Sequence, residues 1–436
     1  MPPTPPTRPR PMWGPDAATA AAVMLTVVVL WGAMKLLSIW AWVVMPGEYG
    51  DTYYYFLSAQ SAATGGGIAT AMREYPTPAG LLLLAPYEFG STHHASYRSA
   101  ILWITSVTDG AFAALLGRRL GPVPVLAWIA VTTSLGQLAL LRFDILPAVV
   151  AGAAVLFALQ RRPKVAAVLL ALGAGLKLWP IVLLPLILDR HDRRRSATAL
   201  GLFAGVGLTL AAFSLALAGW DRLVSPLEYQ GERGLQIEAV AATAAMAQWA
   251  GDEAYRVWYS TFHAYEVTGP SVAMWLTIAQ GASVAGALGC AVLLAWWWLR
   301  GGRPQALAWL ALSLVGTFVV TSRALSPQYL LWLAAPAVAA LAVAWAGGHE
   351  APPPLRTLLT FVGTLVLCVL TTAIYPVYYG GITGRGAETE RALALLTLRN
   401  VGLVALVAWS AWCAVRASRQ PDGTVSHPST GAGSST

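Results

Sequence analysis

The sequence has little charge for its length. Only 11% of its 436 residues are Asp, Glu, Lys or Arg, whereas 57% are hydrophobic. A soluble globular domain carries about 25% charged residues, so this composition excludes an ordinary soluble protein. Apolar stretches of roughly 20 residues recur along the chain, and they are continuous rather than alternating. We therefore predict an all-α fold, a polytopic transmembrane helical bundle, and not a membrane β-barrel.

The motifs of nucleotide and metal chemistry are also missing. The sequence contains no Gly-Lys-Ser/Thr phosphate loop and no dinucleotide-binding fingerprint. Its six histidines lack metal-ligand spacing, and no acidic cluster suits Mg²⁺ or Mn²⁺. The three cysteines lie far apart in hydrophobic spans, which predicts no disulfide framework. We expect no metal and no cofactor, so an enzyme of this kind must take its activated substrate from the membrane.

Lysine is scarce as well: only three of the 28 basic residues are lysines, and the net charge is +8. Arginine and alanine dominance is typical of a GC-rich genome, such as an actinobacterial one. The basic residues cluster in short loops, near 118–119, 161–164, 190–195, 300–303 and 416–419. The positive-inside rule assigns these loops to the cytoplasm, which explains the charge without nucleic-acid binding. Two long polar segments, 46–97 and 220–270, then fall together outside the cell membrane.

Hydrophobic runs divide the chain into one membrane domain and two tails. Residues 1–15 and 417–436 are predicted to be disordered, and residues 16–416 to form the transmembrane domain. The first span is too long for a cleaved signal peptide, so we expect a retained anchor. About eleven spans are predicted, near 17–45, 98–118, 121–141, 144–160, 165–188, 197–219, 271–299, 305–321, 326–346, 356–377 and 391–416.

One span conflicts with the charge pattern. Lys164 and Arg190 both favour the cytoplasm, but the 25 residues between them are too few for two crossings. Pro180 disfavours helix at Trp179. We therefore predict that 165–188 enters the membrane, breaks near 177–180 and returns. The alternative is a straight span with an exceptional charge pattern.

Asp51 follows the first span and precedes three tyrosines, Tyr53 to Tyr55. Tyrosines are common at the membrane interface, but an interfacial anchor needs no acid. A carboxylate there can accept a proton from a hydroxyl presented at the membrane surface. The alternative is that Asp51 caps the next helix.

Several charged residues lie within or between spans, where they are costly and therefore functional candidates. Arg142 could bind a phosphate with Asp144 holding its guanidinium, or the two could form a structural clasp. Lys177, at the break of the fifth span, could face the same side or snorkel. Asp109 is expected to pair with a cation or hydroxyl inside the bundle, and Lys35 to be structural.

Six short motifs occur in an order that resembles glycosyltransferase family 87 of the GT-C superfamily, over nearly the whole chain outside the tails. They are Asp51 after the first span, Arg142-Phe143-Asp144-Ile145-Leu146-Pro147, Lys177-Leu178-Trp179-Pro180, Arg233-Gly234-Leu235-Gln236-Ile237-Glu238, Ser326-Pro327-Gln328-Tyr329-Leu330-Leu331-Trp332, and Tyr375-Pro376 with Leu398-Arg399-Asn400. That family includes actinobacterial polyprenyl-phosphate-mannose-dependent mannosyltransferases and an arabinofuranosyltransferase relative.

The resemblance implies an integral membrane enzyme with an extracytoplasmic active site, a polyprenyl-phosphate sugar donor, a lipid or glycan acceptor and inversion of the anomeric centre. The family's base is an acid in the first outer loop, which maps onto Asp51. Some relatives place a histidine near Gln328, where this chain has glutamine, so no titrating partner is expected there.

The residues around this site then receive two expected roles. Residues predicted to bind the donor phosphate are Arg142, Lys177, Arg323 and Arg399. Residues predicted to bind the sugar or the acceptor are Tyr53, Asp144, Arg233, Gln236, Glu238, Gln328 and Tyr329.

Mannose is the expected sugar, with arabinofuranose as the nearest alternative. A lipid or sugar transporter is an alternative of another class, but the sequence has no internal repeat of the kind transporters often carry. A scaffold for envelope assembly would not require Asp51.

Overall fold

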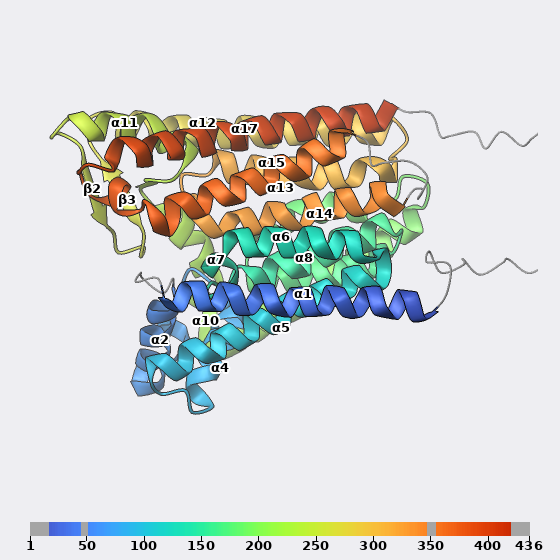
Figure 1. Cartoon of the computed structure of the whole chain (residues 1–436), viewed down its shortest axis with the longest axis horizontal. Helices are drawn as coiled ribbons and strands as arrows, with labels where there is room; N and C mark the ends of the chain where they lie inside the picture. The colour runs from blue at the N-terminus through green and yellow to red at the C-terminus, as the bar shows by residue number, and fades with distance from the viewer. Residues whose placement is uncertain (1–16, 45–50, 347–354, 420–436) are drawn as a thin grey trace, which may run out of the picture.

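The computed structural model describes residues 17–44, 51–346 and 355–419, which form a helical bundle capped at one end by smaller elements (Figure 1). Within these ranges, seven helices have the length and hydropathy of membrane spans. They are α1 (Ala17–Val44), α5 (His94–Leu120), α10 (Arg193–Glu232), α12 (Val272–Leu299), α13 (Leu307–Thr321) together with the 3₁₀ turn before it, α15 (Leu355–Thr372) together with the π-helical turn after it, and α17 (Thr389–Arg419). The predicted class, a polytopic helical membrane protein, is confirmed.

Four shorter apolar helices complete the bundle: α6 (Pro122–Leu135), α8 (Ile145–Leu159), α9 (Pro163–Leu176) and α14 (Leu330–Ala346). Each of the eleven predicted spans overlaps one of these eleven helices, although α6, α8, α9 and α14 are shorter than a full crossing. The predicted tail at residues 1–15 lies outside the described residues. Residues 420–436 of the second predicted tail also lie outside the described residues, while its first three residues, 417–419, belong to α17.

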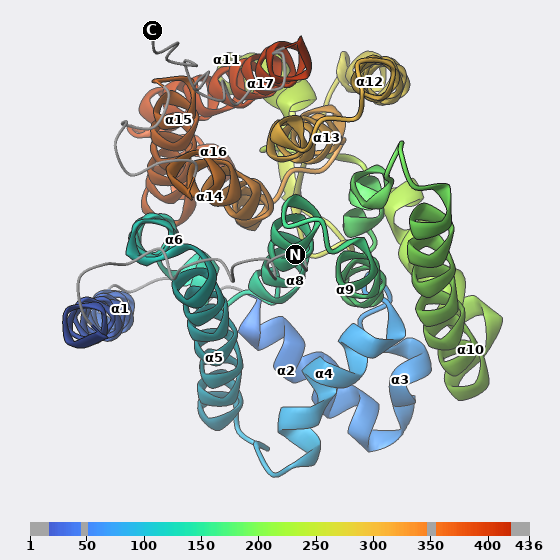
Figure 2. The same cartoon turned by 90° about the vertical axis from the view of Figure 1, so that its right-hand side faces the viewer.

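Helix α8 forms the centre of the bundle, where it packs against α5, α9, α13 and α14 (Figure 2). Most of its side chains are buried, as are those of α14. A Cβ at Gly152 would come within 2.5 Å of the Ala335 Cβ, so this close crossing of α8 and α14 needs a glycine. The N-terminus of α8 follows Arg142 and Asp144, so the central helix fixes both charged residues.

The predicted break in the fifth span is confirmed. Helix α9 ends at Leu176, Lys177 is extended, and the chain returns as the 3₁₀-helix η2 (Trp179–Ile187), which packs along α9. Arg195, which follows η2, donates a hydrogen bond to the carbonyl of Arg161, which precedes α9. The two ends of this hairpin therefore meet at one end of the bundle, and Lys177 lies at its tip.

The two long polar segments lie at the same end of the bundle (Figure 1). The first contains α2 (Thr52–Ser61), the π-helix η1 (Ala62–Gly66), α3 (Gly67–Thr70) and α4 (Thr77–Glu88). The second begins inside α10, which bends at Gly219 (φ 79°) and continues beyond the predicted end of its span at residue 219. It then forms η3 (Val240–Ala242), α11 (Thr243–Gly251) and an antiparallel sheet, ordered β1-β3-β2, that the sequence analysis did not predict. The strands are β1 (Leu235–Gln236), β2 (Arg256–Tyr259) and β3 (Tyr265–Thr268).

Short elements join the remaining helices. They are α7 (Gln137–Leu140), η4 (Pro304–Ala306), η5 (Pro327–Tyr329), the π-helix η6 (Ala373–Val377) and α16 (Gly380–Thr383).

Asp109, fully buried in α5, has the cationic partner that we expected. Its carboxylate lies 3.0 Å from the Lys35 ammonium of α1. The indoles of Trp31 and Trp128 also donate to it, at 2.6 and 2.7 Å. An ion pair with these additional hydrogen bonds can persist in an apolar interior, and it ties α1 to the bundle.

Candidate active site

Asp51 occupies the N-cap position of α2, but its side chain makes no capping hydrogen bond. The carboxylate instead accepts hydrogen bonds from Arg142 and, at 3.3 Å, from the Tyr55 hydroxyl. Both contacts reach Oδ2. The side chain is 25% exposed, so the carboxylate remains accessible to a hydroxyl group in the cavity.

Arg142 is anchored at both ends of its guanidinium. One terminal nitrogen pairs with Asp51, and the other donates to the Tyr375 hydroxyl at 3.1 Å. The expected partnership between Arg142 and Asp144 is wrong, because Asp144 binds a different cation. Asp51 therefore occupies the position at the guanidinium that the sequence analysis gave to Asp144.

Lys177 forms an ion pair with Asp144 at 2.7 Å. Asp144 is fully buried and also accepts a hydrogen bond from the Trp332 indole at 3.0 Å. The Lys177 ammonium lies 5.1–5.3 Å from the ring centroids of Tyr75, Tyr329 and Trp332. Aromatic faces and a carboxylate together hold the charge of this lysine at the tip of the broken helix.

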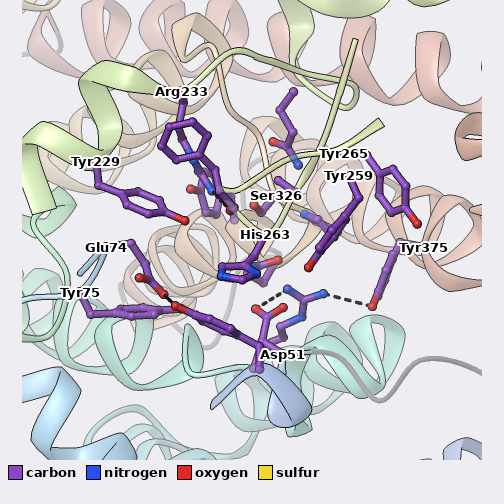
Figure 3. A pocket seen from close by; sticks show the side chains of 18 of the residues that line it. Asp51, Glu74, Tyr75, Tyr229, Arg233, Tyr259, His263, Tyr265, Ser326 and Tyr375 are labelled. Carbon is purple, nitrogen blue, oxygen red and sulfur yellow. Dashed lines mark hydrogen bonds and ion pairs between the residues drawn. The ribbon is translucent and has the colours of Figure 1, made fainter. Parts of the chain in front are cut away.

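Asp51, Arg142 and Lys177 share one cavity of about 710 Å³, which we call the polar cavity. Figure 3 shows Asp51 among the side chains that line it. Both long outer segments contribute to its walls. Other predicted site residues that line it are Tyr53, Arg233, Gln236, Gln328 and Tyr329.

Several buried polar atoms of the polar cavity lack a partner. The Oε1 atoms of Gln236 and Gln328 accept no hydrogen bond from a described residue, and Nε of Arg142 and of Arg233 donates none. Buried polar groups are nearly always satisfied, so these atoms fit a ligand with many hydroxyl or phosphate oxygens.

Four other predicted site residues do not line the polar cavity. Asp144 lies behind Lys177, and Arg323 donates hydrogen bonds to the carbonyls of Gly231 and Arg233 at 3.3 Å. Glu238 and Arg399 are fully buried and pair with each other at 3.3 Å. Burial raises the pKa of Glu238 to about 7, although Arg399 and Arg142 act in the opposite direction. The ligand-binding roles of these residues stay predictions.

The sequence analysis missed Glu74 and His263, which line the polar cavity (Figure 3). Tyr54, which it named only as one of three tyrosines after Asp51, lines the same cavity. The Tyr54 hydroxyl donates to Glu74 at 2.7 Å, and the Tyr54 ring lies 4.2 Å from that of His263. Burial raises the pKa of Glu74, while the Tyr54 hydrogen bond and Arg233 lower it. For Glu74, the only available signal was the isolated Arg73-Glu74 pair in a segment with little other charge.

A second cavity, of about 510 Å³, adjoins the first, and we call it the apolar cavity. It lies among η2, α10, α12 and α13, and Val182, Ala287, Leu294 and Phe318 contribute to its lining. Lys177, Tyr329, Gln230 and Glu74 line both cavities. Lys177 therefore marks the boundary between a polar chamber and an apolar one.

The profile of glycosyltransferase family 87 matches residues 75–372, which is more than half of the chain. The chain belongs to glycosyltransferase family 87. Arg142, Lys177, Arg233 and Gln328 lie inside the matched range, whereas Asp51 precedes it and Arg399 follows it. No curated protein matches the sequence.

Among solved structures, this family 87 chain is similar to ArnT from Cupriavidus metallidurans in the apo state. The two are 13% identical, with 92% of this chain and 78% of that chain covered and a TM-score of 0.42. The predicted family and the general activity are confirmed: the protein is a membrane glycosyltransferase.

Proposed function

We propose that this family 87 protein transfers mannose from a polyprenyl-phosphate donor to a lipid or glycan acceptor, with inversion and with Asp51 as general base. The observation that carries the proposal is the common cavity of Asp51, Arg142 and Lys177. It combines a proton acceptor with cations suited to a phosphate leaving group.

In the proposed reaction, Asp51 takes the proton of an acceptor hydroxyl as that oxygen attacks C1 of the donor sugar. The bond between C1 and the phosphate oxygen breaks, and its electron pair leaves with the lipid phosphate. Attack and departure occur on opposite faces, so the configuration at C1 inverts, as in one-step glycosidases. The departing phosphate is already a stable anion, so it needs fixed positive charge and no acid.

Lys177 is the cation best suited to the phosphate. An ammonium has three N–H donors, and the ion pair with Asp144 uses one of them. Arg142 is in direct contact with Asp51, which supports an orienting role beside any contribution to phosphate binding. Gln236, Gln328 and Arg233 have unpaired polar atoms that suit the hydroxyl groups of a sugar.

The apolar cavity supports a lipid-linked donor. A polyprenyl chain can lie among the apolar side chains between α10, α12 and α13 while its phosphate remains at Lys177. Moving the polyprenyl chain from the bilayer into this cavity exchanges one apolar environment for another, so the chain enters without a desolvation cost. A nucleotide-linked sugar has no lipid chain that could occupy this cavity.

The distribution of basic residues supports an extracytoplasmic active site in the plasma membrane. Arg195, in the first turn of α10, donates a hydrogen bond to the carbonyl of Arg161 in the turn before α9, and Arg190 donates one to the carbonyl of Trp298 near the end of α12. This end of the bundle lies opposite the end that carries the sheet and α2 (Figure 1). Arginine-rich loops are retained in the cytoplasm, so the opposite end, with the polar cavity, faces outward.

In a direct test, the purified protein in nanodiscs receives octyl α-mannoside as the acceptor. The donor is either short-chain polyprenyl-phosphate-mannose or short-chain polyprenyl-phosphate-arabinofuranose. The proposal predicts a product from the mannose donor, with NMR reporting the opposite anomeric configuration to that of the donor. Transfer from the arabinose donor alone would assign the alternative sugar. Retention of configuration would contradict one-step displacement.

A further inference from the structure

A third cavity, of about 390 Å³, adjoins the polar cavity on the side of α2, and we call it the acidic cavity. Its walls come from α2, the segment from Thr70 to Glu74 and the last turns of α10. The lining contains hydroxyl groups of Ser58, Ser61 and Thr70, together with three carboxylates.

The acidic cavity shares Tyr54, Glu74, Tyr229 and His263 with the polar cavity. Glu74 also lines the apolar cavity, so its carboxylate stands where the three chambers meet. The hydrogen bond from Tyr54 and the packing of Tyr54 on His263 hold this junction together.

The charges of the two chambers differ in sign. Three cations, Arg142, Lys177 and Arg233, and two carboxylates, Asp51 and the shared Glu74, line the polar cavity. Three carboxylates, Glu74, Glu228 and Glu232, and a single described cation, Arg73, line the acidic cavity. Arg73 is already paired with Glu228 at 3.5 Å. Like charges repel, so the acidic cavity is unfavourable for a phosphate and favourable for an uncharged polyol.

We propose that the acidic cavity binds the acceptor, an uncharged polyhydroxylated glycan, and delivers its hydroxyl past Glu74 to Asp51. This inference rests on the proposed function. The apolar cavity already suits the lipid of the donor, and Lys177 suits its phosphate. An in-line reaction needs the acceptor to arrive from a different side, and the acidic cavity provides that second access.

Carboxylates, hydroxyls and aromatic rings are the groups that recognise sugars. A carboxylate accepts hydrogen bonds from hydroxyl groups, and a serine or threonine can both donate and accept. Tyr54 and Tyr229 add aromatic surface at the inner end of the acidic cavity. The acceptor glycan would therefore extend from Asp51 between α2 and the end of α10.

The route can be tested on two neighbouring residues of α2. Ser61 lines the acidic cavity, whereas Gln60 is exposed and lines none of the three cavities. Native membranes that contain Ser61→Trp or Gln60→Trp are supplied with donor labelled in the sugar. The assay separates sugar transferred to membrane acceptors from free sugar released by water.

A blocked acceptor route should lower transfer by Ser61→Trp about tenfold or more, while donor hydrolysis stays within about twofold of the parent. Gln60→Trp should behave as the parent for both products. Unchanged transfer by a normally folded Ser61→Trp would overturn the inference. Unchanged transfer by Asp51→Asn would instead overturn the proposed function, so the two failures are distinguishable.

The acceptor class is tested by competition against transfer to membrane acceptors. Octyl α-mannoside should inhibit this transfer at a concentration about tenfold lower than its 6-phosphate does. In the double variant Glu228→Gln, Glu232→Gln, the difference between the two inhibitory concentrations should become smaller. An equal or better effect of the phosphorylated probe on the parent protein would overturn the assignment to an uncharged glycan.

Discussion

Asp51 and Arg142, which are 91 positions apart in the sequence, form an ion pair in the wall of the polar cavity. The pair joins the first outer segment to the loop before α8, the central helix of the bundle. It turns the Asp51 side chain away from the helix it could have capped and towards the cavity. Tyr375 holds the other side of the guanidinium, so the orientation of the proposed base depends on three separate parts of the chain.

Removing the Lys177 charge should weaken donor binding. Lys177→Met alone would leave Asp144 as a buried, uncompensated charge, which typically costs about 3–5 kcal/mol of stability. The informative variant therefore combines Lys177→Met with Asp144→Asn. Its affinity for short-chain polyprenyl-phosphate-mannose, measured by calorimetry, should fall about tenfold or more. Lys164→Met, at an exposed position away from the cavity, is the control; an unchanged affinity in the folded double variant would contradict the assignment.

Filling the apolar cavity should affect long-chain donors more than short-chain ones. Ala287 lines this cavity, and Ala285→Trp on the same helix, α12, adds equal bulk at an exposed position outside it. Ala287→Trp should lower kcat/KM for a long-chain donor about tenfold, with a much smaller loss for a two-isoprene donor. An equal loss for both donors, or none for either, would argue against a lipid-binding role.

Glu238 should make stability depend on pH. Its pKa is about 7 in the folded protein, whereas an unfolded glutamate has a pKa of about 4.3. The folded state therefore binds the proton more tightly. This contribution to stability is fully present below about pH 4.3 and is lost as pH rises through about 7.

Scanning fluorimetry between pH 5 and 8.5 checks this sign. The Tm of the parent should fall with rising pH relative to that of Glu238→Gln, which has no proton to lose. Glu253→Gln, which removes a largely exposed carboxylate, should keep the pH profile of the parent. Parallel profiles for the parent and Glu238→Gln would contradict the raised pKa.

Much of the bundle could be predicted because a membrane restricts the choices of the backbone. Apolar runs must be helical, since no water is available to satisfy peptide groups in the hydrocarbon core. Charge spacing and Pro180 also predicted the break after α9. The sheet was missed because β1 has only two residues and pairs with β3, about thirty positions later. Such pairing depends on tertiary contacts that local pattern does not encode.

The site could be predicted only in part, for a similar reason. Asp51 and Lys177 stood out because charges near membrane spans are unusual. Their ion-pair partners were not evident from the sequence. Arg142 lies two residues before Asp144 in the chain, but in the fold Arg142 pairs with Asp51 and Asp144 pairs with Lys177. Glu74 was missed because a glutamate in a polar segment resembles any solvated side chain. Only the fold shows that it stands between three cavities.

The most direct measurement compares sugar transfer by Asp51→Asn with transfer by the parent protein, at equal levels of folded protein in the same membranes. Asparagine preserves the shape of the side chain but cannot take a proton from the acceptor hydroxyl. A general base contributes about 10²–10⁴-fold to a rate, so transfer should fall by that factor while donor binding is retained. Transfer at the parental rate would contradict Asp51 as the base.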